Sequence, residues 1–191
     1  MDEDLRLVKE VLKGNLDSFN IIVNKYELPI LRFIYNLIKN TQTAEDITQD
    51  VFITVYNKLY LYKSEYKFSN WIFQIARNKC IDYIRKNKKT VEANIDEMRE
   101  LASKEATPQD LLEFKEMKEQ VEKFLCSLEE VDRQIVLLRY SGENTTFHDI
   151  AQIMKISESS VKRRYYNARE KFKKSISIQE KRCRGWIVAH F

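Results

Sequence analysis

The sequence predicts an all-α protein made of two small helical domains joined by a flexible linker. Three observations support this fold class. The 191 residues include only 3 Gly and 2 Pro, which favours helices connected by short polar loops. Apolar residues recur at spacings of three and four positions along most of the chain, as in amphipathic helices. This pattern is lost over residues 90–109, so the segment separates two helical regions.

The first domain, predicted over residues 1–89, begins with an amphipathic helix over residues 2–13. Its apolar residues follow helical spacing: Leu5, Val8 and Leu12. Gly14 and Asn15 are typical helix-ending residues and predict that the helix stops before them.

A longer helix follows, with Asp17 as its expected N-cap. Pro29 lies inside the apolar pattern and is expected to kink or split the helix, because proline lacks a backbone N–H group. The apolar stripe on either side of Pro29 consists of Phe19, Ile22, Val23, Tyr26, Ile30, Phe33, Ile34 and Leu37.

The third helix is expected to begin at Thr43, with Asp46 completing a variant capping box. One side of this helix is apolar: Ile47, Val51, Val55 and Leu59. The other side carries acids and amides: Asp46, Gln49, Asp50 and Asn57. Composition alone favours a solvated surface for that side.

Residues 60–68 contain four aromatic side chains and fit neither a helical nor a strand period: Tyr60, Tyr62, Tyr66 and Phe68. We interpret the segment as a loop. Its aromatic rings either fill the local core, which composition favours, or offer stacking surfaces for an unpaired base.

Ser69 is the expected cap of the next helix, which buries Ile72, Ile75, Ala76 and Tyr83. From Arg77 to Lys89 the chain has six basic residues and one Asp, a net charge of +5. Such a run is usually a solvated face. Its position beside an aromatic loop makes it a candidate for nucleic-acid contact.

The charge changes sign over residues 91–113, where seven acids and two bases give −5. We interpret residues 90–109 as an acidic, mobile linker and residues 110–175 as a second helical domain. Its first two helices carry apolar stripes: Leu111, Phe114, Met117, Val121, Leu125, then Leu128, Val131, Ile135 and Leu138. A turn over residues 141–145 ends the second of these helices.

The second domain closes with a helix-turn-helix pattern. Thr146 caps a short helix, with Asp149 at the capping-box position, and Ser157 caps a longer basic helix. The longer helix is apolar on one side: Val161, Tyr165, Ala168 and Phe172. Its outward side carries Lys162, Arg163, Tyr166 and Asn167. With a net charge of +6 over residues 155–174, this helix is suited to a DNA major groove.

The sequence gives little support for catalysis or cofactor binding. It has no Gly-rich phosphate loop, no recognisable nucleophile and no paired His ligands, so we expect neither enzyme activity nor a cofactor or metal. Three widely separated cysteines, Cys80, Cys126 and Cys183, are typical of reduced thiols in a cytoplasm. No apolar run approaches the roughly 20 residues that span a bilayer, so a cytoplasmic protein without membrane insertion is expected.

Four segments of the chain occur in a characteristic order: AEDITQDVFITVY, WIFQIARNKCIDYIRK, LEEVDRQIVLLRY and DIAQIMKISESSVKRRYYNAREK. Together they resemble bacterial RNA polymerase sigma factors of the extracytoplasmic-function (ECF) class, in the sigma-70 family. The similarity covers roughly residues 10–175, in the order and spacing of the family. The resemblance implies a sigma region 2-like bundle over residues 1–89 and a region 4-like helix-turn-helix over residues 110–175.

The resemblance also implies roles for individual residues. The face bearing Asp46, Gln49 and Asp50 is expected to bind the clamp of the largest subunit of core RNA polymerase. Residues expected to capture or hold the downstream (−10) promoter element are Tyr62, Lys63, Arg77, Asn78, Asp82, Arg85 and Lys86. Those expected to meet the upstream (−35) element are Ser160, Lys162, Arg163, Tyr166 and Asn167.

The implied function is promoter-specific transcription initiation, with core polymerase, promoter DNA and an anti-sigma factor, often membrane-anchored, as partners. Asn167 stands where many relatives have Arg, and residues 141–145 form a turn about one residue longer than usual. The tail at 176–191 has no recognised counterpart. Two alternatives stay open: a stand-alone helix-turn-helix regulator, and a sigma-like interaction protein that cannot open DNA.

Overall fold

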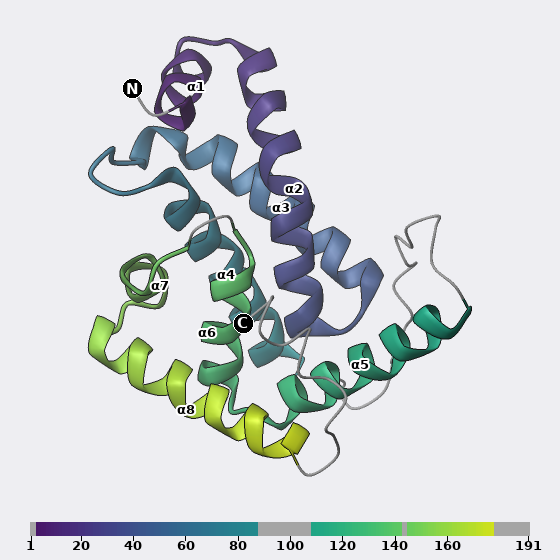
Figure 1. Ribbon diagram of the computed structural model, residues 1–191. Helices are drawn as coiled ribbons and strands as arrows, with labels where there is room; N and C mark the ends of the chain where they lie inside the picture. The colour runs from purple at the N-terminus through teal and green to yellow at the C-terminus, as the bar shows by residue number, and fades with distance from the viewer. Residues whose placement is uncertain (1–2, 88–107, 143–144, 178–191) are drawn as a thin grey trace. The chain divides into compact units, whose positions relative to one another are not determined.

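The computed structural model describes residues 3–87, 108–142 and 145–177. These residues form eight α-helices, one short 3-10 helix and no strand, which confirms the all-α prediction (Figure 1). The chain divides into two compact units. The first contains Met1–Glu100 and Leu137–Glu158, and the second contains Leu101–Val136 and Ser159–Phe191. The predicted linker as far as residue 107, and the tail from residue 178, lie outside the described residues.

The first helix, α1 (Glu3–Leu12), has a different buried face from the predicted one. Leu7, Val8 and Val11 are buried, whereas Leu12 is 54% exposed. The reason is Asp4, whose carboxylate accepts hydrogen bonds from the Tyr26 hydroxyl at 2.5 Å and from Lys25 Nζ at 2.7 Å. Because the Asp4 side chain is buried, the helix is rotated so that Leu12 faces solvent, whereas the apolar spacing predicted that Leu12 would be buried.

Helix α2 (Leu16–Ile38) continues through Pro29, so the proline does not split it. Its N-cap is Asn15 rather than Asp17, because the Asn15 side chain accepts hydrogen bonds from the backbone N–H groups of Asp17 and Ser18. The apolar stripe is buried as predicted at six positions: Ile22, Tyr26, Ile30, Phe33, Ile34 and Leu37.

Helix α3 (Thr41–Lys58) leads into the 3-10 helix η1 (Leu59–Leu61), and α3 begins earlier than predicted. Its N-cap is Asn40 rather than Thr43, since Asn40 Oδ1 accepts a hydrogen bond from the Thr43 N–H at 2.8 Å. The predicted apolar side is confirmed as buried: Ile47, Val51, Val55 and Leu59.

Helix α4 (Phe68–Lys86) begins one residue before the expected cap, Ser69, and Lys67 is the N-cap. No side chain caps this end. Instead Phe68 is fully buried, and its ring lies 5.6 Å from that of Tyr26 on α2. Helices α2, α3 and α4 pack on one another, and α1 packs on α2 (Figure 1).

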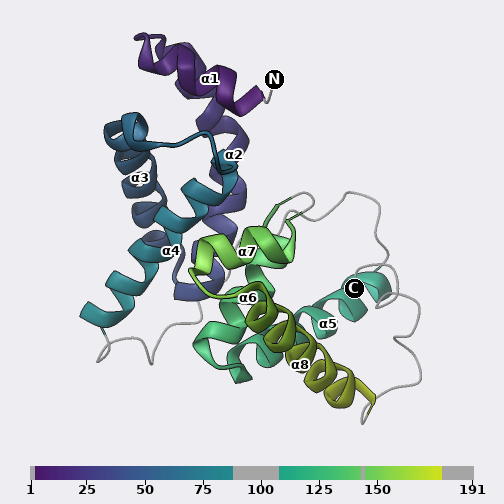
Figure 2. The ribbon, with the colours of Figure 1, turned by 90° about the vertical axis from the view of Figure 1, so that its left-hand side faces the viewer.

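The first unit is completed by the end of α6 (Glu130–Tyr140, from Leu137 onward) and by α7 (Phe147–Met154). Helix α7 packs beside α4 (Figure 2). The capping box at its start is confirmed, with Thr146 and Asp149 bonded reciprocally. Residues 137–158 thus group with the first compact unit, whereas the sequence assigned them to the second domain; the domain boundary itself stays a prediction.

The second unit contains α5 (Pro108–Ser127), the first part of α6 and α8 (Glu158–Ser177, from Ser159 onward). Helix α8 begins directly after Ser157. Phe124 of α5 and Phe172 of α8 place their ring centroids 4.7 Å apart. Other buried apolar residues of this unit are Leu125, Leu128, Ile135, Val136, Val161, Tyr165 and Ala168.

Candidate polymerase and nucleic-acid interfaces

The outer side of α3 carries the residues predicted to bind polymerase. Asp46, Gln49 and Asp50 are all exposed, and Asp50 lies 3.4 Å from Lys79 Nζ of α4. The face extends to Ile53, which is 60% exposed. Ile53 is seven residues beyond Asp46 and therefore on the same side of the helix. Sequence reasoning missed this apolar extension, although the spacing was visible.

Three aromatic rings form a cluster where the loop at residues 62–67 joins α4. Tyr62 lies 5.3 Å from Phe68 and 5.6 Å from Trp71, and Phe68 lies 5.8 Å from Trp71. Phe68 is fully buried, while Tyr62 and Trp71 are half-buried. Partly exposed rings on a fixed base can stack on a planar ligand such as a nucleobase.

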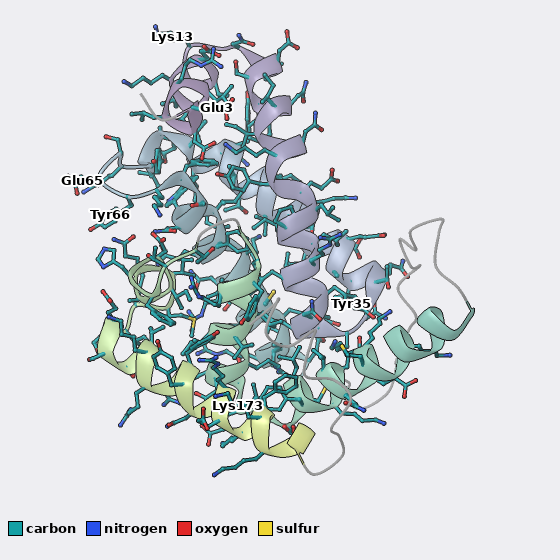
Figure 3. All side chains as sticks on the ribbon, viewed as in Figure 1. Glu3, Lys13, Tyr35, Glu65, Tyr66 and Lys173 are labelled. Atoms are coloured by element: carbon teal, nitrogen blue, oxygen red, sulfur yellow. The ribbon has the colours of Figure 1, made fainter. Side chains whose placement is uncertain are left out.

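A hydrogen bond within the loop before α4 links its two ends. The Tyr62 hydroxyl donates a hydrogen bond to the Tyr66 carbonyl oxygen at 2.6 Å. The side chains of Glu65 and Tyr66 extend outward from this loop (Figure 3), and Lys63 is also exposed. Each interpretation of the aromatic segment therefore fits some of its residues. Phe68 fills the core, whereas Tyr60 and Tyr66 are exposed.

One face of α4 continues from the aromatic cluster towards the C-terminal end of the helix. Asn78, Asp82 and Arg85 are exposed at spacings of four and three, so they share this face. Trp71 lies seven residues before Asn78 and belongs to the same face. Lys86 is exposed beside the face, and Arg77 is half-buried.

The exposed side of α8 matches the predicted one. Val161, Tyr165, Ala168 and Phe172 are buried, as their spacing predicts. Ser160 is half-buried. The four residues expected to face outward are exposed: Lys162, Arg163, Tyr166 and Asn167. An exposed cationic face on a helix buried along its other side is the arrangement that major-groove readers use.

Arg164 fixes the orientation of α8 and was not singled out from the sequence. Its Nη1 donates to Asp132 Oδ1 at 2.8 Å and lies 3.8 Å from Glu129 Oε2, both near the start of α6. The hydrogen bond and charge of Asp132 raise the pKa of the Arg164 guanidinium. Arg164 is therefore part of the scaffold that orients Lys162 and Arg163, its neighbours in sequence.

Outside these faces, the described residues include an unreactive buried thiol but no metal site and no membrane-spanning helix. Burial raises the pKa of the Cys80 thiol to about 12, so this thiol stays protonated and unreactive at neutral pH. Among the described residues, no group of three or more His, Cys, Asp or Glu side chains is arranged to hold a metal ion. None of the described helices combines the length and apolar composition that a bilayer crossing requires.

Comparison with known proteins identifies the relatives of this chain. Residues 22–90 match the family described as Sigma-70 region 2, and residues 69–174 match a family described as a protein of unknown function, DUF722. The ECF RNA polymerase sigma factor SigM of Bacillus subtilis is 31% identical over 153 residues, covering 80% of this chain and 91% of SigM. SigW of the same organism, also an ECF RNA polymerase sigma factor, is 29% identical and covers 88% of this chain and 94% of SigW.

A solved structure has the same fold. The sigma factor RpoE of Bartonella quintana, in complex with the anti-sigma factor NepR, superposes with a TM-score of 0.66 at 18% identity. The superposition covers 85% of this chain and 99% of RpoE. Taken with the sequence relatives, the chain belongs to the ECF sigma factors of RNA polymerase. Its role is accordingly promoter-directed transcription initiation, and its curated relatives are not enzymes in the catalytic sense.

Proposed function

We propose that this sigma factor binds core RNA polymerase through the outer side of α3, captures unpaired −10 bases beside α4 and reads −35 duplex through α8. The observation that supports this proposal is that each predicted face includes exposed side chains on a helix whose opposite side is buried. The protein acts where core polymerase is found, in the cytoplasm. It needs no cofactor for these tasks.

Polymerase docking rests on the acidic and amide face of α3. Asp46, Gln49 and Asp50 offer carboxylate and amide oxygens to a basic partner, and Ile53 offers apolar area beside them. Complementary charge of this kind raises association rates and orients the two partners. The proposed partner surface is the clamp of the largest polymerase subunit.

Capture of the −10 element rests on the aromatic cluster and the polar face of α4. Strand opening becomes favourable when the protein offers an extruded base both stacking and hydrogen bonds to its edge. Tyr62 supplies a ring, and Asn78 and Asp82 supply polar groups on the same side of α4 as Trp71. The basic residues Lys63, Arg77, Arg85 and Lys86 hold phosphates.

Reading of the −35 element rests on Ser160, Lys162, Arg163, Tyr166 and Asn167. We also propose an anti-sigma factor as a regulatory partner, because the related RpoE was solved with one. A stand-alone helix-turn-helix regulator would use only the second domain. That alternative leaves the match of residues 22–90 to Sigma-70 region 2 unexplained.

The decisive experiment mixes the purified chain with core polymerase and sequences the transcripts made from genomic fragments. We expect transcripts with common upstream motifs at both elements. A chain that binds core polymerase but yields no promoter-directed transcript would instead support the sigma-like interaction protein.

A further inference from the structure

Helix α1 is linked to the aromatic cluster beside α4 through one tyrosine of α2. Asp4 lies in the first turn of α1, and its Oδ2 accepts a hydrogen bond from the Tyr26 hydroxyl at 2.5 Å. The Tyr26 ring lies 5.6 Å from the Phe68 ring, at an interplanar angle of 63°. Phe68 in turn contacts Tyr62 and Trp71. Successive contacts therefore connect a carboxylate of α1 to the rings proposed to stack on a −10 base.

The burial of Asp4 exceeds what the start of α1 requires. An acid in the first turn of a helix is stabilised by the helix dipole even when it is exposed to solvent. Asp4 is nevertheless only 7% exposed, and so is Tyr26. Burying a carboxylate is costly, and an apolar side chain would fill the same space without that cost. The hydrogen bond adds what apolar packing lacks, a fixed direction that holds the Tyr26 hydroxyl, and hence its ring, in one position.

Lys25 holds the Asp4 carboxylate in place. Its Nζ lies 2.7 Å from Asp4 Oδ1 and 3.2 Å from Glu3 Oε2. Partial burial alone would lower the pKa of the Lys25 ammonium group, but the hydrogen bonds to Asp4 and Glu3 outweigh burial and raise the pKa. The two oxygens of Asp4 thus have separate partners, Lys25 for Oδ1 and Tyr26 for Oδ2. Hydrogen bonds to a charged acceptor are stronger than neutral ones, so Tyr26 is held more firmly than by packing alone.

Phe68 connects the position of Tyr26 to the rest of the aromatic cluster. Phe68 is fully buried, and no side chain caps α4 at this end, so the packing of Phe68 fixes where the helix begins. Its ring meets the Tyr62 ring at 5.3 Å and 88°, an edge-to-face arrangement with a preferred orientation. The other end of Tyr62 is held by its hydrogen bond to the Tyr66 carbonyl oxygen. A displaced Phe68 ring therefore changes the plane that Tyr62 offers to a base.

Helix α1 also lies beside the segment that leads into the aromatic loop. It packs on α2 and on η1, and η1 ends directly before Tyr62. In Figures 1 and 2 the N-terminal end of α1 is the end that lies towards the start of α4. The bond from Asp4 to Tyr26 thus anchors the end of α1 that adjoins the aromatic cluster.

We propose that Asp4 is a positioning residue for −10 capture: its hydrogen bond to Tyr26 sets the Phe68 ring and thereby the stacking plane of Tyr62. This inference rests on the proposed function of the aromatic cluster. Supporting residues of a binding site keep its contact groups in the productive orientation, and stacking on a base depends on that orientation. Loss of the bond slows strand opening. Polymerase docking and closed duplex binding are unaffected, because they use the outer side of α3 and α8.

The first test compares three variants of the full-length chain bound to core polymerase. Tyr26→Phe removes only the hydroxyl group and Asp4→Ala removes the acceptor, whereas Asp4→Asn keeps an oxygen acceptor. A fluorescent base analogue in the −10 element measures promoter opening. We expect Tyr26→Phe and Asp4→Ala to slow opening about three- to tenfold, as for the loss of one hydrogen bond. Asp4→Asn should recover more than half of the wild-type rate, and none of the three should change affinity for core polymerase or closed duplex.

Ser18→Ala is the matched control. The Ser18 hydroxyl donates to Glu10 Oε2 at 2.5 Å, so this bond also joins a carboxylate of α1 to α2, and Ser18 is buried too. It takes part in none of the ring contacts described above. Asn20→Ala, at an exposed amide of α2, is the surface control. Both controls should open the promoter at the wild-type rate. An equal loss for Ser18→Ala and Tyr26→Phe would overturn the proposal, since α1 would then act only by packing on α2.

Coupling between the two residues gives a second criterion. Because Asp4 acts through Tyr26, the double variant Asp4→Ala with Tyr26→Phe should open the promoter no more slowly than the slower single variant. A double variant whose loss equals the product of the two single losses would show independent effects and would refute the positioning role.

A measurement without polymerase or promoter separates this proposal from the proposed function. The chain has two tryptophans, so in a Trp186→Phe background the fluorescence of Trp71 alone reports the packing of the aromatic cluster. We expect Tyr26→Phe and Asp4→Ala to shift this emission and to make it more accessible to a neutral quencher, with Ser18→Ala unchanged. Identical emission in all these chains would contradict the proposal even if the wild-type chain opens promoters. A wild-type chain that opens no promoter would count against the proposed function alone.

Discussion

Lys162 lies on the exposed face of α8, one residue after the buried Val161, so its ammonium group is directed away from the core. A cation in this position is suited to a backbone phosphate, which contributes affinity without selecting a base. Phosphate contacts release counterions from DNA, and each contact therefore leaves a measurable trace in the salt dependence of binding.

Lys162→Ala is expected to weaken binding to all −35 sequences and to lower the slope of log affinity against log salt by about one unit. Titrations of duplex DNA at several salt concentrations measure this slope. Lys173→Ala is the control, since Lys173 lies further along α8 and pairs with Glu170 at 3.0 Å. An effect limited to one base pair, with an unchanged slope, would assign Lys162 to base recognition.

Asn78→Ala is expected to slow strand opening by roughly ten- to a hundredfold and to leave initial duplex binding nearly unchanged, because a side-chain hydrogen bond to an extruded base forms only after opening. Tyr62→Ala should act in the same direction. Fluorescent base analogues at the −10 element measure opening, with Asn20→Ala as the control. Equal loss in binding and in opening would contradict the flipped-base role.

Asp149 also predicts a pH dependence of stability. Its folded pKa is depressed, so its contribution is present above the unfolded value of about 3.9 and is lost as pH falls towards the folded value. We expect Asp149→Asn to lower the free energy of unfolding by about 2 kcal/mol at neutral pH. The difference from the wild type should shrink below about pH 4, as urea denaturation at several pH values would reveal. A constant difference down to pH 2 would indicate that charge plays no part.

At the scale of elements, the apolar stripes of the sequence predicted α3 and α8 well, because each of these helices buries one side and exposes the other. The stripe failed for α1, where Asp4 bonds to Tyr26 and Lys25. These hydrogen bonds join residues more than 20 positions apart, so the spacing of apolar residues within α1 does not indicate them.

Helix starts were less predictable than helix faces. Asn15 and Asp17 are both good N-caps, and sequence alone does not choose between them. Gly14 has a φ of +96°, and the chain turns there, which places Asn15 rather than Asp17 at the cap. The start of α4 depends on the burial of Phe68 against Tyr26 and Tyr62, which is a tertiary effect.

The sequence predicted the residues of the candidate site only where it also predicted which face of their helix is exposed. The outward residues of α8 follow from helical spacing, whereas the roles of Tyr62 and Asn78 rest on family resemblance. The hydrogen bond from Asn70 of α4 to Asp149 of α7 was not predictable, because a capping box explains Asp149 from the local sequence and the second carboxylate oxygen meets Asn70 only in the folded chain.

The outer side of α3 acts as a unit in the proposed polymerase contact, so charge reversal there should be position-dependent. We expect Asp46→Lys to slow association with core polymerase at least tenfold at low salt, with a smaller effect at high salt. Glu45→Lys makes the same change in net charge, about 100° around the helix, and is the control. Similar losses for both variants would indicate general electrostatics rather than a defined face.

At the scale of the whole molecule, the two predicted domains, residues 1–89 and 110–175, should contribute separately to promoter recognition. Lys162→Ala and Asn78→Ala lie in different domains under this division. Sites without shared partners give additive effects, usually within about 0.5 kcal/mol. Promoter binding by the polymerase complex with each single and the double variant measures the coupling. A coupling above about 1 kcal/mol would contradict independent contributions from the two predicted domains.

The pair between Asp50 and Lys79 has a consequence for the order of events. Asp50 belongs to the face proposed for polymerase, and Lys79 follows Asn78 on the helix proposed for DNA. Exposed pairs of this kind are worth about 0–1 kcal/mol, so a competing cation from the polymerase displaces Lys79 easily. Under the proposed contacts, the displaced ammonium group would lie without its carboxylate partner beside the residues proposed for the −10 element. Attachment of the polymerase would then make Lys79 available to nucleic acid, and this weak surface pair would couple the two proposed interfaces.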